Sequence, residues 1–272
     1  MNNKYIKRAI EEDFKNKVRM GKVLILLGAR RVGKTELINK YLSNQNSQEY
    51  LLLNGEDQRT LDLFAERTVS NYKRLIGNKK LLVIDEAQKI PEIGLKLKLI
   101  VDSIKDIKVI ATGSSIFDLS NRLGEPLVGR SNTMNLFPLA QMEFALEEDY
   151  LTTRTKLEER LIFGAYPELE EHEDWNEKIE YLNGIINNYL LRDILEFNGI
   201  KKSDKIMDLL RLIAFQVGKE VNIEELAISL KGISRNTVES YLDLLSKVFI
   251  IYNVRGFSKN LRKEIIKTSR WY

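Results

Sequence analysis

The chain has 272 residues, of which 43 are Lys or Arg, 39 are Asp or Glu, one is His and none is Cys. Without cysteine there are no disulfides or thiolate metal sites, and the single histidine, His172, stands among acidic residues, which argues against a histidine-based metal site. No apolar run approaches the ~20 residues of a membrane span, and the N-terminus does not read as a secretory signal. We therefore expect a cytoplasmic globular protein without a membrane partner, built as two modest domains or as one large domain with an appendage.

The first element is predicted from apolar spacing. Ile6, Ile10, Phe14 and Val18 recur every four residues along an otherwise polar and basic stretch. This period is typical of an amphipathic helix, so residues 4–19 are expected to form a helix that packs on the edge of a sheet.

A glycine loop joins the apolar strand expected over residues 23–27 to a helix that runs to about residue 42. The loop reads Gly-x-x-x-x-Gly-Lys-Thr, the pattern of a phosphate-binding loop between a strand and a helix. Its two glycines allow a tight turn that points several backbone N–H groups into one concavity. The following helix directs its positive end at the phosphates. The residues expected to contact a nucleotide are Gly28, Ala29, Arg30, Arg31, Val32, Gly33, Lys34, Thr35 and Glu36.

Two side chains of the loop have expected chemical roles. Lys34 is placed to reach the β- and γ-phosphates, which makes it a candidate catalytic residue, and the Thr35 hydroxyl is placed to bind Mg²⁺. The pattern therefore predicts binding of ATP or ADP together with Mg²⁺.

A second signal lies about fifty residues further on. After a strand expected over residues 49–53 and a helix over residues 60–75, the apolar run at 81–84 predicts a strand buried on both faces. This strand delivers Asp85 and Glu86 to the carboxyl edge of the sheet, where ligands bind in open α/β folds. Asp85 suits Mg²⁺ binding and Glu86 suits orientation of an attacking water. The alternative is that the pair merely starts the next helix.

Small hydroxyl residues end the next predicted strand. After a helix at 95–104, residues 108–113 read as a strand beside the one that carries Asp85, which would aim Thr112 or Ser114 at the γ-phosphate or the attacking water. An equally weighted alternative is that these hydroxyls only cap a helix that starts near residue 116.

An arginine precedes the last predicted strand, residues 132–136. Arg130 follows a loop rich in Gly and Pro, where its guanidinium could reach a γ-phosphate of its own or of a neighbouring chain. Arg122 is the competitor for this role, and a surface salt bridge is the alternative for either arginine.

Taken together, these motifs resemble the AAA+ branch of P-loop ATPases, and more narrowly the prokaryotic ATPases in which the nucleotide domain is followed by a winged helix and a nuclease-like domain. The segments that carry the resemblance over nearly the whole chain are residues 28–35, 82–88, 111–115, 129–130, 136–139, 164–167 and 189–193. The resemblance implies ATP hydrolysis with Thr35 and Asp85 on Mg²⁺, Glu86 as base, Thr112 or Ser114 as sensor and Arg130 as arginine finger. The family usually continues beyond residue 272, so we carry over no nuclease activity.

The second half of the chain is predicted to be helical and then to form a winged helix. Helical spacing runs over 139–196, including one long helix from Trp175 to Leu190, and its paired glutamates at 147–148, 158–159 and 170–171 are expected on solvated faces. The winged helix is expected from a helix at 206–217, a short strand at 221–223, helices at 224–230 and 234–248, and an apolar strand at 249–254. Ser234 is the predicted N-cap of the last helix, and Gly232 suits the turn before it.

Charge makes double-stranded DNA a candidate partner. Residues 201–272 hold 14 basic and 8 acidic side chains, against 29 and 31 in residues 1–200. The recognition helix would show Arg235, Asn236, Glu239 and Tyr241. The cations of the tail, which would neutralise phosphates, are Arg255, Lys259, Arg262, Lys263, Lys267 and Arg270. The alternative is that the winged helix packs on the ATPase domain or binds protein.

The expected architecture is an α/β AAA+ domain with a parallel sheet and flanking helices over residues 1–145, a helical connector over 146–200, a winged helix over 201–258 and a basic tail over 259–272. The first functional hypothesis is an ATPase that couples nucleotide state to a partner and that acts as a homo-oligomer if Arg130 works in trans. The second is a nucleotide-gated switch with slow or no turnover, and a weaker third is a non-enzymatic DNA-binding regulator.

Overall fold

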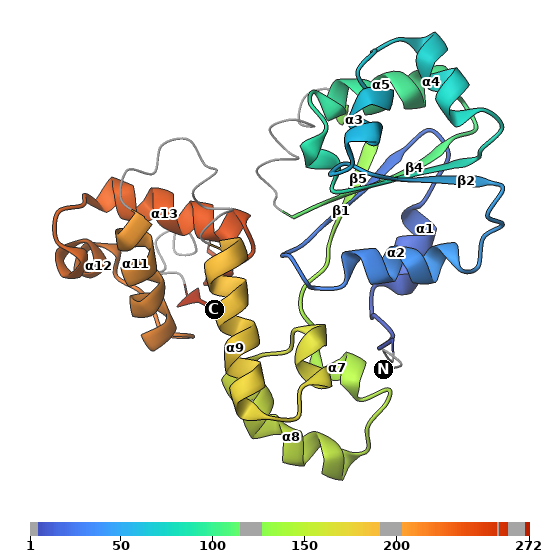
Figure 1. Cartoon of the computed structure of the whole chain (residues 1–272). Coiled ribbons are helices and arrows are strands. Elements are labelled where there is room, and N and C mark those ends of the chain that lie inside the picture. The colour runs from blue at the N-terminus through green and yellow to red at the C-terminus, as the bar shows by residue number, and fades with distance from the viewer. Residues whose placement is uncertain (1–4, 115–126, 191–202, 255, 261–269) are drawn as a thin grey trace. The chain divides into compact units, whose positions relative to one another are not determined.

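The computed structural model describes residues 5–114, 127–190, 203–254, 256–260 and 270–272. The chain divides into two compact units, residues 1–182 and residues 183–272, and Figure 1 labels the elements of both. None of the helices in these described ranges combines the length and the apolar character that a membrane-spanning helix needs.

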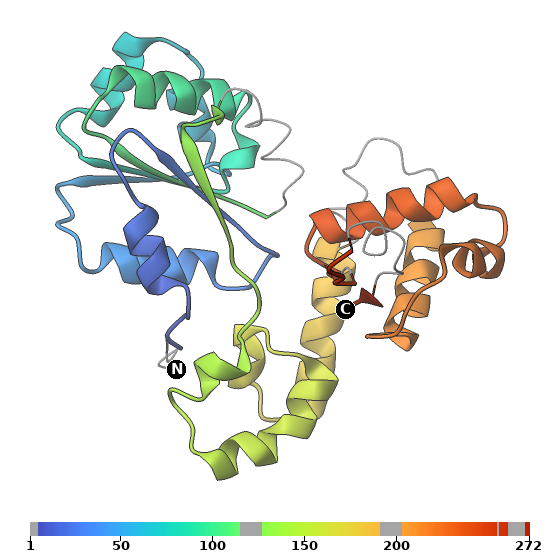
Figure 2. The ribbon, with the colours of Figure 1, turned by 180° about the vertical axis from the view of Figure 1, so that it is seen from behind.

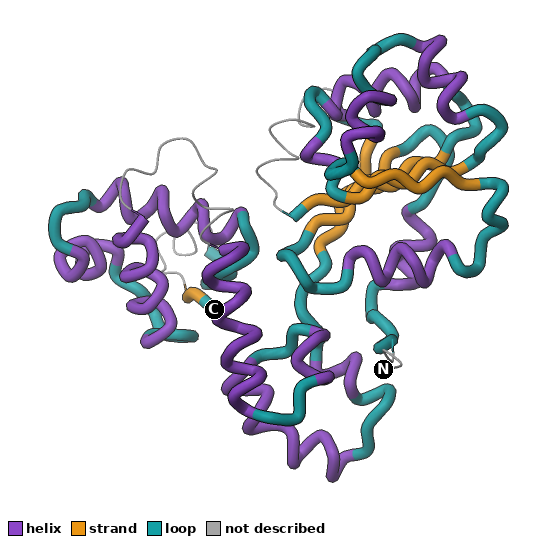
Figure 3. The backbone as a smooth tube through the Cα atoms, in the orientation of Figure 1, coloured by secondary structure: helices purple, strands orange, loops and turns teal. Residues whose placement is uncertain are grey.

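Unit 1 is built on a parallel sheet of five strands, which is drawn in orange in Figure 3. The strands lie in the order β2-β3-β4-β1-β5. Their bounds are β1 (Val23–Leu27), β2 (Tyr50–Asn54), β3 (Leu81–Asp85), β4 (Lys108–Gly113) and β5 (Ser131–Asn135). Every strand predicted in this part of the chain is present within one or two residues. β1 is buried along its whole length and β3 over its first four residues, as expected for parallel strands covered on both faces.

Helices cover the two faces of this sheet. Figures 1 and 2 show α1 (Glu11–Lys17) and α2 (Lys34–Leu42) on one face and α3 (Gln58–Leu63), α4 (Val69–Ile76) and α5 (Ile93–Ser103) on the other. The face under α1 and α2 is closed by Phe14, Leu37 and Ile38, which pack with Leu24 and Leu26 of β1. The order of the strands puts β1 between β4 and β5, so the carboxyl end of β1 lies inside the sheet rather than at its border.

Two predicted helices are shorter than expected. The helix predicted over 4–19 spans only α1, because Glu11 accepts hydrogen bonds from the Arg8 backbone and the Tyr5 hydroxyl and holds the preceding segment out of the helix. The helix predicted over 60–75 is two helices, because Thr68 adopts an extended backbone and caps the first turn of α4 through a bond from Asn71 N.

Helices follow β5, as predicted. They are α7 (Gln141–Phe144), α8 (Tyr150–Phe163) and α9 (Trp175–Ile185), which continues as a π-helical turn at Ile186–Leu190. The expectation that the glutamates here are solvated is wrong for two of them. Glu148 and Glu170 both pair with Arg160, whose side chain is only 7% exposed and lies 3.6 Å from the centroid of the Phe144 ring.

From residue 203 onward, the described part of unit 2 packs three helices against a small antiparallel ladder. The helices are α11 (Ser203–Phe215), α12 (Ile223–Leu230) and α13 (Arg235–Lys247), and the strands are β6 (Asn253–Val254) and β7 (Arg270–Trp271). Arg270 also forms a bridge with Glu220, so three segments meet at this strand. Ser234 caps α13, as predicted, through a bond from Thr237 N.

Three sequence predictions in unit 2 are wrong. Residues 221–223 form no strand, because Asn222 caps α12 and accepts from the backbone N–H groups of Glu224 and Glu225. The strand expected from Phe249 begins only at Asn253, since Phe249 turns with φ 62° and Ile251 is buried in the helical core. Tyr241 is also in that core rather than displayed on α13.

Candidate functional site

The glycine loop lies at the carboxyl end of β1 and leads directly into α2. Gly33 has φ 94°, in the left-handed region that favours glycine, and serves as the N-cap of α2. Gly28 is required for a different reason, since a Cβ there would lie 2.2 Å from the carbonyl oxygen of Leu136. The backbone of the loop therefore crosses the end of β5 at a distance that no side chain would permit.

We predict that Gly28→Ala lowers the free energy of unfolding by about 1–3 kcal/mol, the usual cost of forcing an extra methyl group into packed backbone. Urea denaturation measures this, with Gly184→Ala in α9 as the control, because a Cβ there meets no atom closer than 3.9 Å. An unfolding free energy of Gly28→Ala equal to that of the wild type would contradict the close approach.

The Lys34 side chain lies across the loop. Its Nζ donates to the carbonyl oxygens of Gly28 at 2.8 Å and Ala29 at 2.9 Å, and the residue is 5% exposed. The Lys34 ammonium group is thus held within the concavity of the loop by the Gly28 and Ala29 carbonyls. A phosphate that entered there would meet both this ammonium group and the N-terminal N–H groups of α2.

Two hydroxyl side chains, one from the glycine loop and one from β4, meet the Asp85 carboxylate at the end of β3. The Thr35 hydroxyl donates to Asp85 Oδ2 at 2.8 Å, and the Thr112 hydroxyl donates to Asp85 Oδ1. The register explains the second contact, because Ile84 pairs with Ala111 and places Asp85 beside Thr112. The hydroxyl and carboxylate oxygens are hard ligands of the kind that Mg²⁺ prefers.

Glu86 is held in an uncommon conformation beside Asp85. Its φ of 49° lies in the left-handed region, which costs a non-glycine residue free energy and is often found at functional sites. Its backbone N–H donates to the Thr112 hydroxyl at 3.0 Å. The buried amide of Gln88 donates to Glu86 Oε2 at 2.5 Å and to Ser114 Oγ at 3.2 Å. Thr112 and Ser114 are thus both connected to the acidic pair.

Arg130 is not brought to this cluster within the chain. It precedes β5, which runs parallel to β1 with Ser131 opposite Val23, so it lies at the amino edge of the sheet. The loop starts at the carboxyl edge, five residues or roughly 16 Å further along the strands. Arg130 instead pairs with Asp102 at 2.6 Å. The expectation that it reaches the γ-phosphate of its own chain is therefore wrong, and Arg122 lies outside the described residues.

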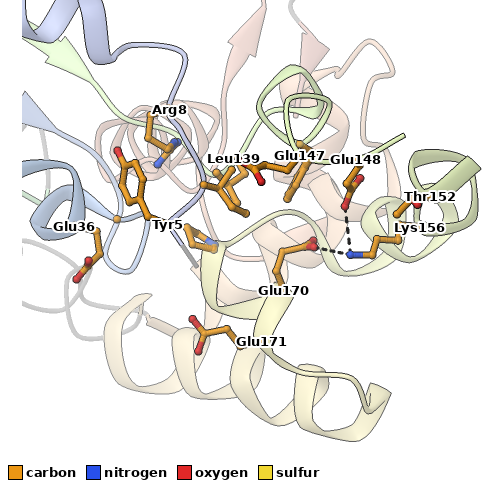
Figure 4. A pocket seen from close by; sticks show the side chains of 14 residues that line it. Tyr5, Arg8, Glu36, Leu139, Glu147, Glu148, Thr152, Lys156, Glu170 and Glu171 are labelled. Carbon is orange, nitrogen blue, oxygen red and sulfur yellow. Dashed lines mark hydrogen bonds and ion pairs between the residues drawn. The ribbon is translucent and has the colours of Figure 1, made fainter. Parts of the chain in front are cut away.

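A cavity of about 510 Å³ adjoins the loop, within the range of small-ligand sites. Figure 4 shows it between the N-terminal segment, the loop and the helices that follow β5. Its apolar lining comes from Ile6, Leu139, Phe144 and Pro167, and its polar lining includes Tyr5, Arg8, Glu36, Glu147, Glu148, Thr152, Lys156, Glu170 and Glu171. Gly33 of the loop also lines this cavity.

The charges around the cavity stabilise one another. A hydrogen bond from Arg160 lowers the pKa of Glu148. Burial opposes the charge of Lys156, but its bonds to Glu170 and Glu148 raise its pKa overall. Burial and the bond to Glu11 raise the pKa of Tyr5. At neutral pH the Glu148 carboxylate is therefore ionised, Lys156 is charged and the Tyr5 hydroxyl keeps its proton.

Sequence reasoning missed several residues of the site, above all Arg8, Gln88 and Glu143. Arg8 contacts the loop and Glu143 across 24 and 135 residues of sequence, so no local pattern indicates the contact. Gln88 stands two residues after Glu86 in a buried 3₁₀ turn, and that spacing is the one signal that would have pointed to it.

The glycine loop, its lysine and the acidic pair thus lie together at the carboxyl edge of the parallel sheet. In comparison with known families, residues 20–145 match the model of an AAA domain. Residues 154–272 match a domain of unknown function, DUF8612. Residues 20–145 are therefore similar to AAA domains, and residues 154–272 are similar to this second domain.

The chain is similar to uncharacterized proteins from three prokaryotes. It is 26% identical to one from Methanocaldococcus jannaschii, 25% to one from Haemophilus influenzae and 24% to one from Mycobacterium tuberculosis. Each match covers 92% of this chain, but the chain spans only 60%, 66% and 53% of these relatives, respectively.

Two solved structures are also similar at low identity. One is a signal transduction ATPase with numerous domains and a tetratricopeptide repeat sensor from Pyrococcus horikoshii, 16% identical, with a TM-score of 0.44 over 92% of this chain and 40% of that one. The other is domain III of the Thermotoga maritima replication initiation protein DnaA, 16% identical, with a TM-score of 0.41 over 84% and 93%.

Proposed function

We propose that the chain is a Mg²⁺-dependent ATPase that couples nucleotide state to a partner. The observation that carries the proposal is the 2.8 Å bond between the Thr35 hydroxyl of the loop and the Asp85 carboxylate at the end of β3. It joins the two predicted Mg²⁺ ligands at the end of a glycine loop whose lysine faces the same concavity. Triphosphate binding and metal binding are thereby combined in one site.

The residues present suit a bound Mg²⁺ ion. In the described parts of the chain no three His, Cys, Asp or Glu side chains gather into a metal site of their own. Mg²⁺ commonly takes only one or two protein ligands and completes its shell with phosphates and water. Thr35 and Asp85 would hold the ion, which when bound would neutralise charge on the phosphates.

The residues of the chain would bind the phosphates, accept the proton, sense the γ-phosphate and hold the base. Lys34 and the loop N–H groups would bind the β- and γ-phosphates, and Glu86 would accept a proton from the attacking water. Thr112 and Ser114 would sense the γ-phosphate through their links to Asp85 and Glu86. The cavity beside Gly33 would hold the base and ribose, with carboxylates available to the ribose hydroxyls and to an adenine amino group.

Arg130 belongs to this proposal only as a residue that acts on a neighbouring chain. Specific activity should then rise with protein concentration, and Arg130→Ala should lose that rise, as measured by phosphate release across a dilution series. Asp102→Asn is the control, because it breaks the same surface ion pair but leaves the guanidinium in place. If specific activity does not change on dilution, Arg130 does not act on the nucleotide of a neighbouring chain.

The partner proposed for unit 2 is double-stranded DNA, with the three helices and the β6–β7 ladder as a winged helix. Its support is limited, because Arg235 is paired with both Glu224 and Glu239. Of the proposed cations outside that helix, Lys259 and Arg270 are exposed, and Arg255, Arg262, Lys263 and Lys267 lie outside the described residues. The alternative to DNA binding is that unit 2 contacts a protein. The alternative to an active ATPase is a nucleotide-gated switch with slow or no turnover.

The proposal is tested by steady-state phosphate release from ATP, with Mg²⁺ or with a chelator, and with or without duplex DNA at low and high salt. We expect release that requires Mg²⁺. Stimulation by DNA that fades as salt rises would support phosphate contacts, and no effect of DNA at any salt concentration would favour a protein partner. No release under any condition, with ATP still bound, would favour the switch.

A further inference from the structure

Arg8 is a buried arginine that joins three separate segments of unit 1. Its side chain is 5% exposed. Nη1 donates to the Val32 carbonyl of the loop at 2.8 Å, Nη2 to the Phe137 carbonyl after β5 at 2.6 Å, and Nε to Glu143 of α7 at 3.1 Å. Each nitrogen of the fork thus has its own acceptor, an arrangement that only the planar guanidinium can provide.

The bond to Val32 has a consequence for the next residue of the loop. In a trans peptide the carbonyl of one residue and the N–H of the next point in opposite directions, because the unit is planar. The peptide bonds of this chain are trans in the described residues. Because Arg8 holds the Val32 carbonyl, the Gly33 N–H points away from Arg8.

The charge of Arg8 is balanced on the side away from the loop. Glu143 is 4% exposed, and its Oε1 accepts from Arg8 Nε and from the Ala9 backbone, while its Oε2 accepts from the Ala140 backbone. A buried ion is stable only when it is paired and hydrogen-bonded. Of the two residues of this ion pair, Glu143 thus balances the charge of Arg8, and Arg8 makes the hydrogen bond to the loop.

From this arrangement we infer that Arg8 is a positioning residue for nucleotide binding, which fixes the Gly33 N–H as a phosphate donor and ties the loop to α7. The inference rests on the proposed function, since it assumes that the loop binds phosphates. Arg8 also lines the cavity beside Gly33, but its three nitrogens already donate to Val32, Phe137 and Glu143, so its proposed action is through the loop. Arg8 fixes the conformation of the loop before the nucleotide binds. Loss of this contact should therefore raise the Kd for the nucleotide.

The test compares three variants in the full chain. Arg8→Lys keeps the charge but has one nitrogen, which cannot reach Val32, Phe137 and Glu143 together. Glu143→Gln disturbs the same buried cluster but leaves the bond between Arg8 and Val32 available. Arg67→Lys is a matched control at an exposed pair with Glu92. The Kd for Mg–ADP is measured by calorimetry, and the unfolding midpoint without nucleotide by circular dichroism.

We expect Arg8→Lys to weaken ADP binding about tenfold, the effect of one misoriented hydrogen-bond donor. Glu143→Gln should lower the unfolding midpoint at least as much while its ADP affinity stays within about threefold of the wild type. Equal losses of affinity in both variants, or unchanged affinity in Arg8→Lys, would overturn the inference. Absence of ADP binding by the wild type would instead overturn the proposed function on which it rests.

Discussion

Lys34→Ala should weaken ATP binding by about 10- to 100-fold and reduce phosphate release to background. The estimate follows from the ~1.5–3 kcal/mol that a hydrogen bond to a charged group contributes. Lys34 Nζ lies within 2.9 Å of the Gly28 and Ala29 carbonyls, at the centre of the loop. ATP binding by calorimetry and phosphate release in the same preparation measure both effects.

The control for this variant is Lys40→Ala, an exposed lysine on the same helix. It should bind and hydrolyse ATP as the wild type does. Circular dichroism of both variants checks that loss of the two carbonyl contacts has not unfolded the loop. Normal turnover in a folded Lys34→Ala protein would mean that the glycine loop is not the nucleotide site.

Glu86→Gln should reduce kcat by about 10²- to 10³-fold, the contribution typical of a general base, while ATP affinity changes little. Gln has the shape of Glu but cannot accept the proton of the attacking water. The carboxylate lies at the end of β3, where Gln88 and the backbone bond to Thr112 hold it beside Asp85. Single-turnover hydrolysis separates this chemical step from product release.

Glu56→Gln, an exposed change after β2, is the matched control. Loss of turnover with retained binding in Glu86→Gln alone identifies the base. A variant that hydrolyses ATP as fast as the wild type would remove Glu86 from the mechanism. If the wild type binds ATP but does not hydrolyse it, Glu86→Gln cannot reduce turnover further, and the protein would be a nucleotide-gated switch.

The sheet and the centre of the site could be predicted because their signals are local. Four of the five strands are apolar runs or end in the loop or acidic motifs, and a parallel sheet gathers such ends at one edge. This is why Thr35 and Asp85 could be predicted to lie together, whereas for Thr112 the sequence left contact with the site and capping of a helix equally open.

The contacts that could not be predicted depend on long-range packing. Arg8 meets the loop because residues 5–10 are held outside α1 by Glu11, which apolar spacing does not reveal. Arg130 lies at the far edge because β5 joins the sheet parallel to β1. A residue that precedes a parallel strand lies at the amino edge whatever the strand order, so the predicted parallel sheet already argued against contact between Arg130 and the loop of its own chain. In unit 2, the short apolar runs at 221–223 and 249–252 suited a strand as well as a buried turn.

The central claim, that the chain binds and hydrolyses ATP at the loop and the acidic strand end, is tested most directly by one measurement. Wild-type and Glu86→Gln proteins are mixed with Mg–ATP, and bound nucleotide and released phosphate are followed together. We expect both proteins to bind ATP and only the wild type to release phosphate. Binding by neither protein, or equal phosphate release by both, would contradict it.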